Sequence, residues 1–84
     1  MKTTVRNTAR LNVAADLVEA LAAIEHEQWM HWSLAVAENV SAARRAKWQR
    51  SWVDYAKLTE HLKEADRVWA RKVVALLRRR NLIH

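Results

Sequence analysis

The segment from Glu25 to Trp32 is the first candidate for chemistry in the chain. It holds two carboxylates and two imidazoles, the groups that bind metal ions and transfer protons in proteins. A zinc site on a helix needs two histidines four residues apart, so that both face one side. His26 and His31 are five residues apart, which turns them about 140° away from each other on a regular helix. We therefore predict no metal site, and nothing in the sequence implies a cofactor.

Acid–base catalysis would find its groups in this segment and in His61, but no nucleophile accompanies them. The three serines of the chain stand in no known nucleophile motif. The 84 residues include no Cys, no Gly and no Pro, which excludes thiol chemistry, disulfides and Gly-rich phosphate loops. These exclusions favour a binding protein over an enzyme.

Five tryptophans form the second unusual feature. Each offers a large apolar face and one N–H donor, so it serves either a core or a stacking surface. A core role is the simpler interpretation for Trp29, Trp32, Trp52 and Trp69. The alternative is a surface on which aromatic rings alternate with cations, as single strands and nucleotides require. Trp48 and Trp52 are the best candidates for that exposure.

The charge of the chain is positive and uneven. The net charge is +6, with −3 over residues 21–40 and +5 over residues 61–84. A basic surface attracts nucleic acid, anionic small molecules or acidic protein surfaces, although a solvated basic surface is the plain alternative. The cations form two patches: Arg44, Arg45, Lys47 and Arg50, and then Arg78, Arg79 and Arg80.

The elements that must position these side chains are helices, because tight hairpin turns need the missing glycines. We predict an all-α domain of three helices, with two long antiparallel helices and a short basic helix between them. Residues 1–11 form an N-terminal arm and residues 12–84 a single helical domain. The first helix runs from Asn12 to about Asn39.

Two capping residues predict where the other helices begin. Ser41 caps the short basic helix, which ends near Ser51, and Thr59 caps the third helix, which Asn81 ends. The connection between them, residues 52–58, is rich in β-branched and aromatic residues and is predicted to be extended.

Apolar residues at helical spacing predict which faces are buried. The first helix carries two ridges, Leu17, Leu21 and Ile24 beside Val18, Trp29, Trp32 and Val36. The inner stripe of the third helix is Leu62, Ala65, Trp69, Val73, Leu76 and Leu77. A chain of 84 residues does not cover two such faces by itself, so we expect a homodimer. Glu25 falls inside the second ridge, where a carboxylate is either partnered or functional.

Two segments resemble the RyR-type repeat domain, a family named for the ryanodine receptor and also found in bacterial and phage proteins. The first is His26-Glu27-Gln28-Trp29, and the second is the run Trp52 to Leu58, followed by Asp66-Arg67. The resemblance covers about Ala20 to Leu77, and short phage and prophage proteins share the pattern. A Gly-containing turn and a Pro that the family usually carries are absent here.

The resemblance implies a binding module for a nucleotide-derived ligand. The positions that match the family pattern are His26, Glu27, Trp29, Tyr55, Leu58, Lys63, Asp66 and Arg67. Some of these have a structural alternative, since Asp66 and Arg67 can tie the third helix to the first through Glu25 or Glu27.

Our leading hypothesis is a non-enzymatic, cytoplasmic binding module of phage or bacterial type for an anionic nucleotide-like ligand. Its ligand-binding residues are His26, Trp29, Tyr55, Arg67 and Arg71. One alternative is a small protein that binds and regulates or inhibits another protein through a face rich in Trp and Arg. A second alternative is a nucleic-acid-binding protein that uses the two basic patches. No apolar run is long enough for a membrane span, so we expect no membrane partner.

Overall fold

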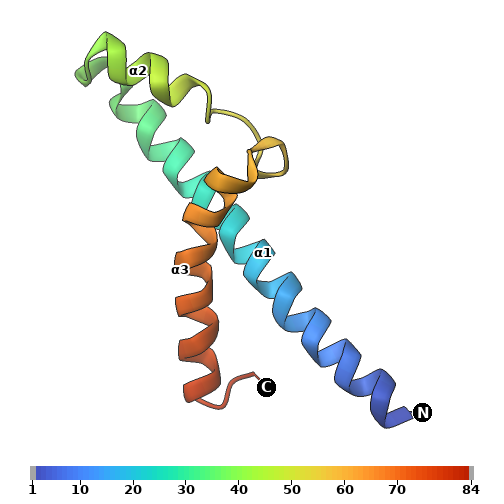
Figure 1. Cartoon of the computed structure of the whole chain (residues 1–84). Coiled ribbons are helices and arrows are strands. Elements are labelled where there is room, and N and C mark those ends of the chain that lie inside the picture. Colours follow the sequence, from blue (N-terminus) through green and yellow to red (C-terminus); the bar gives the residue numbers. More distant parts are fainter. Residues whose placement is uncertain (1, 84) are drawn as a thin grey trace.

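The computed structural model describes residues 2–83, with side chains from Ala14 onward; Met1 and His84 lie outside the described residues. Every regular element in this range is helical, so the predicted all-α class is confirmed. The helices α1 (Lys2–Val36) and α3 (Glu60–Arg79) are the two long elements; they pack antiparallel, and in Figure 1 the first turns of α3 lie across the middle of α1. The short α2 (Ala42–Gln49) lies between them in sequence, as predicted.

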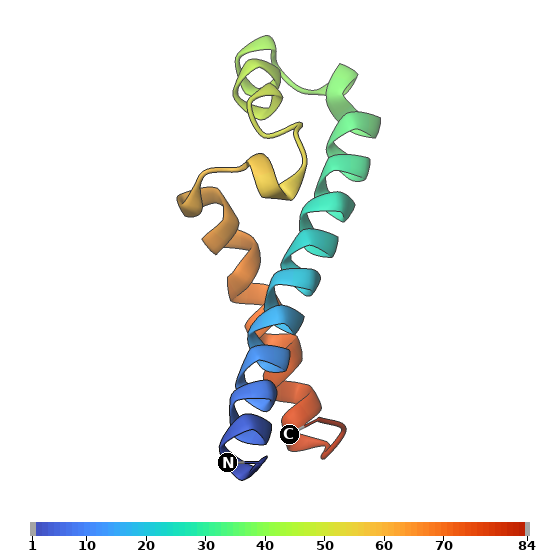
Figure 2. The same ribbon diagram turned by 90° about the vertical axis from the view of Figure 1, so that its right-hand side faces the viewer.

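Single 3₁₀ turns flank the short helix. The turn η1 (Ala37–Asn39) ends α1, and η2 (Tyr55–Lys57) interrupts the connection that was predicted to be extended throughout. Figure 2 shows α2 at one end of the molecule and both chain termini at the other. The two predicted basic patches are therefore at opposite ends. Neither long helix, over the part of the chain described, has an apolar stretch of the kind that crosses a bilayer.

The first helix begins earlier than the sequence pattern predicted. Its backbone is helical from Lys2 rather than from Asn12, so the segment predicted as an arm, residues 1–11, continues α1 from Lys2 onward. The reason is that this segment contains no Gly or Pro to stop a helix, and adding residues to an existing helix costs little.

The N-caps predicted for the second and third helices are confirmed, whereas Asn12, the expected cap of the first helix, lies within α1. The Ser41 hydroxyl accepts a hydrogen bond from the Arg44 N–H at 3.1 Å, and the Thr59 hydroxyl accepts one from the Leu62 N–H at 3.3 Å. Each cap satisfies one of the backbone donors that the first turn of a helix leaves without a partner.

The predicted C-terminal signal of the third helix is also present. Asn81 has a φ of 58°, in the left-handed region that Asn tolerates better than most residues. This reversal brings the Leu82 N–H to the Leu77 carbonyl at 2.9 Å, the hydrogen bond of a Schellman motif.

The buried apolar residues are small. Ala22 of α1 and Ala70 of α3 are fully enclosed, and Val74 and Leu58 complete the apolar core of the described residues. Small side chains at the crossing let the two helix backbones approach closely.

The inner stripe predicted for the third helix is wrong for most of its members. Leu62, Trp69, Val73 and Leu76 are exposed, while the neighbouring Ala70 and Val74 face α1. The physical reason is that the close helix crossing has room for Ala and Val but not for an indole. Trp32 also departs from its predicted place in the core, and is exposed.

Candidate functional site

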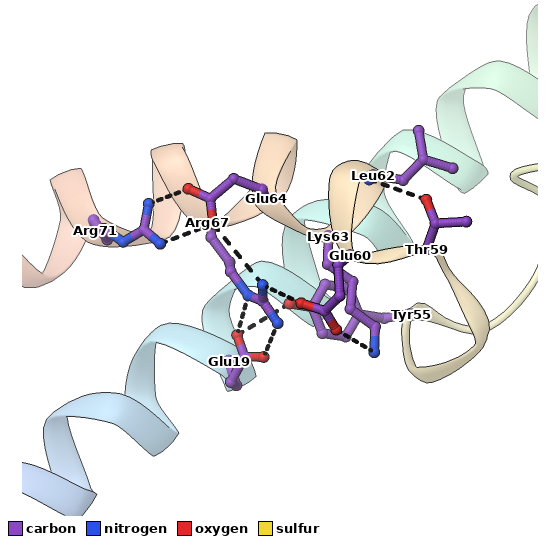
Figure 3. A network of polar contacts seen from close by, with 9 residues as sticks. All are labelled: Glu19, Tyr55, Thr59, Glu60, Leu62, Lys63, Glu64, Arg67 and Arg71. Carbon is purple, nitrogen blue, oxygen red and sulfur yellow. Dashed lines mark hydrogen bonds and ion pairs between the residues drawn. The ribbon is translucent and has the colours of Figure 1, made fainter.

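A cluster of charged side chains joins α1 to α3 on one side of the molecule (Figure 3). Arg67 donates to both oxygens of the Glu19 carboxylate, from Nε to Oε2 at 2.8 Å and from Nη2 to Oε1 at 2.7 Å. Such a pair of parallel hydrogen bonds matches the planar guanidinium to the planar carboxylate. The Tyr55 hydroxyl donates to Glu19 Oε2 at 3.0 Å, which ties η2 to the same group.

The remaining nitrogen of Arg67 is also used. Nη1 donates to Glu60 Oε2 at 2.8 Å, and Lys63 approaches the other Glu60 oxygen at 3.6 Å. Arg67 lowers the pKa of the Glu19 and Glu60 carboxyls, and the two carboxylates raise the pKa of the guanidinium. Burial and the bond to Glu19 raise the pKa of the Tyr55 hydroxyl.

Arg71, one helical turn further along α3, is held by Glu64. Its Nη2 donates to Glu64 Oε1 at 2.9 Å, and the bond lowers the pKa of that carboxyl. Arg67 and Arg71, the two cations among the predicted ligand-binding residues, therefore both form ion pairs with carboxylates. An anionic ligand there would have to displace a carboxylate from each guanidinium.

His26 lies deep between α1, α3 and the connection, with 4% of its surface exposed. Its Nε2 is 2.7 Å from the Val53 carbonyl oxygen, and because a carbonyl only accepts, Nε2 carries the proton. Nδ1 lies 3.8 Å from Asp66 Oδ2. Burial is the main cause that raises the pKa of the Asp66 carboxyl. The imidazole stacks on Trp29, with ring centroids 5.8 Å apart.

A shallow cavity of about 240 Å³ opens beside this histidine, and its lining includes Trp29, Leu58, Leu62 and Asp66. Of the predicted ligand-binding residues, His26 and Trp29 line it, whereas Tyr55, Arg67 and Arg71 do not. The lining contains a carboxyl group and no Lys or Arg. The geometry of this cavity therefore suits a neutral or cationic group better than an anion.

The sequence reasoning missed two hydrogen bonds of Ser33, one of which attaches the connection (residues 52–58) to α1. The Trp52 Nε1–H donates to Ser33 Oγ at 2.9 Å, and the buried Ser33 hydroxyl donates to the Met30 carbonyl at 3.2 Å. Glu19 is the other missed residue. The signal for it was its position, since Glu19 and His26 are seven residues apart and so lie on the same side of a helix.

Aromatic contacts attach α2 to the end of α1. The Trp48 ring packs edge-on against Trp29 at 6.0 Å between centroids and tilted against Trp32 at 5.7 Å. No residue of α2 itself is buried, so these contacts are its principal anchor. Arg45 adds a second anchor, because its Nε donates to the Ala37 carbonyl at 3.0 Å beyond the end of α1.

The other cations of α2 have a different environment. Arg44, Lys47 and Arg50 are exposed, and within the described residues none of them forms an ion pair. Arg44 precedes Trp48 by one helical turn and shares its side of the helix. We call the surface made by Trp32, Trp48, Arg44 and Lys47 the Trp–Arg end.

The second predicted basic patch lies in and just after the last turn of α3. Arg79 and Arg80 are exposed there, and Arg78 lines a hollow of about 300 Å³ between α1 and α3 together with Arg71. Among the side chains described, no three His, Asp or Glu groups converge as they would around a metal ion.

Comparison of the chain with family models, curated proteins and solved structures gives no match.

Proposed function

We propose that the protein is a non-enzymatic binding module that docks an acidic segment of another protein on the Trp–Arg end. The observation that carries the proposal is the contrast between the two groups of cations. Arg67 and Arg71 are each held by a carboxylate. Arg44 and Lys47 belong to α2, whose Trp48 packs on the exposed Trp32, and they form no ion pair within the described residues.

An exposed tryptophan flanked by cations is the composition of a protein-binding hot spot. Trp and Arg are the residue types that contribute most to such interfaces, since they combine apolar area with directed hydrogen bonding. Trp32 leaves 54% of its surface open, and the Trp48 ring beneath it provides a fixed support. The cations at this end select a partner of negative charge.

Binding to nucleic acid has less support from the arrangement of charge. A strand of nucleic acid follows a continuous cationic track. Here the two basic patches lie at opposite ends of the molecule, and the carboxylates of Glu19, Glu60 and Glu64 lie along the helices between them (Figure 3). The helix α2 has eight residues, so the surface that it offers at this end suits a short peptide.

The nucleotide-like ligand of our leading sequence hypothesis also stays a prediction. The cavity next to His26 and Trp29 offers an aromatic wall, but its charged group is the Asp66 carboxyl. The resemblance to the RyR-type repeat domain implies a binding module, and that broader class is the part of the hypothesis that we retain in this proposal.

A peptide-selection experiment tests the proposal. The intact chain is immobilised, and a random peptide library displayed on phage is selected against it. We expect enriched peptides to combine Asp or Glu with one large apolar residue. Trp32→Ala should weaken their binding about 30-fold, the effect of removing a hot-spot residue worth about 2 kcal/mol.

The chain provides matched controls. Trp69→Ala removes a tryptophan of nearly the same exposure, 56% against 54%, from a different surface and should leave peptide binding unchanged. Lys47→Glu should weaken binding, whereas Lys57→Glu makes the same charge change on η2 and should not. The proposal is overturned if no acidic peptide is enriched, or if Trp32→Ala and Trp69→Ala have equal effects.

A further inference from the structure

The cavity beside His26 combines one carboxylate with an apolar wall. The apolar residues of its lining are Trp29, Leu58, Leu62 and Ala65. Asp66 provides its charged group. A cavity of about 150 Å³ is large enough to take up a benzene ring. The volume here, about 240 Å³, therefore has room for one such ring together with a short side arm.

The Asp66 carboxylate forms no ion pair with a Lys or Arg in the part of the chain described. The two cations nearest to it in the sequence, Lys63 and Arg67, approach other carboxylates. The Asp66 side chain is 20% exposed, and burial is the main cause that raises the pKa of its carboxyl. A partly buried carboxylate of this kind is stabilised when a positive charge comes close to it.

Two hydrogen-bond acceptors lie close together at this cavity. His26 is 4% exposed, and its Nε2–H donates to the Val53 carbonyl, so in the neutral imidazole Nδ1 is an acceptor. Nδ1 and Asp66 Oδ2 are 3.8 Å apart. That separation is too long for a hydrogen bond between the two atoms, but one ammonium group can donate to both from about 2.8 Å. The pair therefore has the geometry of a site for a positively charged hydrogen-bond donor.

The charge around the cavity also favours a cation. Residues 21–40, which include the α1 side of the cavity, carry a net charge of −3 and no Lys or Arg. Glu25 belongs to this stretch, and after burial its negative charge is a further cause that raises the pKa of Asp66. The positive charges of the chain do not belong to the lining. A cation that enters the cavity therefore compensates the local negative charge, and an anion would be repelled by it.

We propose that the cavity binds a small organic cation, a primary amine whose apolar body is about the size of one aromatic ring. The apolar body lies against Leu58 and Leu62, and the ammonium group donates to Asp66 Oδ2 and His26 Nδ1. Charge selects the ligand through Asp66, and the volume of the cavity limits its size. This site is distinct from the Trp–Arg end, so the inference does not depend on the proposed function.

Three compounds of similar shape and different charge test the proposal. Phenethylamine is a cation at neutral pH, phenethyl alcohol is neutral, and phenylacetate is an anion. Each is titrated into the isotope-labelled intact chain and followed by nuclear magnetic resonance. We expect phenethylamine to bind most tightly, with ring protons close to the Leu58 methyl groups, and phenylacetate to bind most weakly. Equal affinities for the three compounds, or tighter binding of phenylacetate, would overturn the proposal.

A matched pair of aspartate variants tests the role of the charge. Asp66→Asn keeps the size of the side chain and should weaken the binding of phenethylamine about 10- to 100-fold, the range for a hydrogen bond to a charged group. Asp54→Asn makes the same change at an exposed aspartate outside the lining and should leave the affinity unchanged. Equal effects of the two substitutions contradict the proposal.

A second pair of variants protects the test against a folding defect in Asp66→Asn. Ala65→Phe fills the cavity from an exposed position without a change of charge and should abolish the binding of phenethylamine. Ala35→Phe makes the same change at an exposed position outside the lining and should bind as the natural chain does. Circular dichroism checks that both variants are folded. Full binding by Ala65→Phe, or no binding of phenethylamine by the natural chain, overturns the proposal, and neither result depends on any peptide ligand.

Discussion

Arg67 of α3 holds Glu19 of α1 through two parallel hydrogen bonds of 2.8 and 2.7 Å across 48 residues of sequence. The pair fixes which side of α3 faces α1. With Arg67 directed at Glu19, Ala70 and Val74 enter the core and the Trp69 side of the helix is left outward. A polar pair of this kind specifies the arrangement of two helices, which apolar contacts alone constrain weakly.

The first prediction concerns the geometry of that pair. Arg67→Lys keeps the charge but loses the planar fork, so it should lower the midpoint of thermal unfolding, and Arg67→Ala should lower it further. Arg71→Ala is the matched control. Arg71 also lies on α3 and pairs with a carboxylate, but that carboxylate, Glu64, belongs to the same helix, and the Arg71 side chain is 53% exposed, against 18% for Arg67. Circular dichroism during heating measures the midpoints. Equal losses for Arg67→Ala and Arg71→Ala would refute the structural role of Arg67.

Acid should weaken the fold through the same carboxylate. Arg67 holds the pKa of Glu19 below its ordinary value of 4.5. A carboxyl whose pKa is lower in the folded state stabilises that state above the ordinary pKa, and the contribution is lost as the pH falls through the folded-state pKa. The free energy of unfolding in urea should therefore fall below about pH 4.5.

The variant Glu19→Gln isolates this contribution. It should be less stable than the natural chain at pH 7 and should show a shallower loss in acid, although Glu60 and Glu64 retain their own lowered pKa values. An acid profile unchanged in slope by the substitution would show that Glu19 does not contribute.

The attachment of α2 should depend on Trp48. Its two ring contacts, with Trp29 and Trp32, are worth about 0.5–1.5 kcal/mol each, so Trp48→Ala should cost about 1–3 kcal/mol. Because α2 buries no residue of its own, its amide protons should lose their protection from hydrogen exchange while those of α1 and α3 keep theirs. Uniform loss of protection along the whole chain would contradict this local role.

Removing only the acceptor of the hydrogen bond between Trp52 and Ser33 should lower the free energy of unfolding. Ser33→Ala leaves the Trp52 N–H without its acceptor, at a cost of about 1–3 kcal/mol in urea unfolding. In a Trp52→Phe background, which lacks that donor, the same substitution should cost less. Additive losses in the double variant would mean that the two groups are not coupled.

Local signals in the sequence predicted the helices well. Ser41 and Thr59 correctly predicted where two helices begin, and Asn81 correctly predicted where the third ends. These positions can be predicted because capping depends on a few neighbouring residues. The start of α1 was missed since the segment before Asn12 contains neither a clear periodicity nor a helix breaker.

The rotation of α3 could not be read from apolar spacing. The residues on the Trp69 side of α3 and those on its Ala70 side both recur at a helical period. The sequence analysis predicts that the side with the larger residues is buried, but Ala70 and Val74 are the buried ones. The partner of Arg67 was likewise expected to be Glu25 or Glu27, but the way the helices cross brings Glu19 there instead. Which carboxylate each cation meets depends on how the folded helices are aligned. For this reason the sequence alone did not predict that Arg67 and Arg71, two of the predicted ligand-binding residues, form ion pairs within the chain.

The most direct test of the proposed function is the nuclear magnetic resonance spectrum of the five indole N–H groups during titration with a selected acidic peptide. The proposal predicts that the signals of Trp32 and Trp48 move as the peptide binds and that the signal of Trp69 stays in place. If only Trp29, in the cavity beside His26, responds, or if the signals move with a nucleotide and not with the peptide, binding at the Trp–Arg end is contradicted.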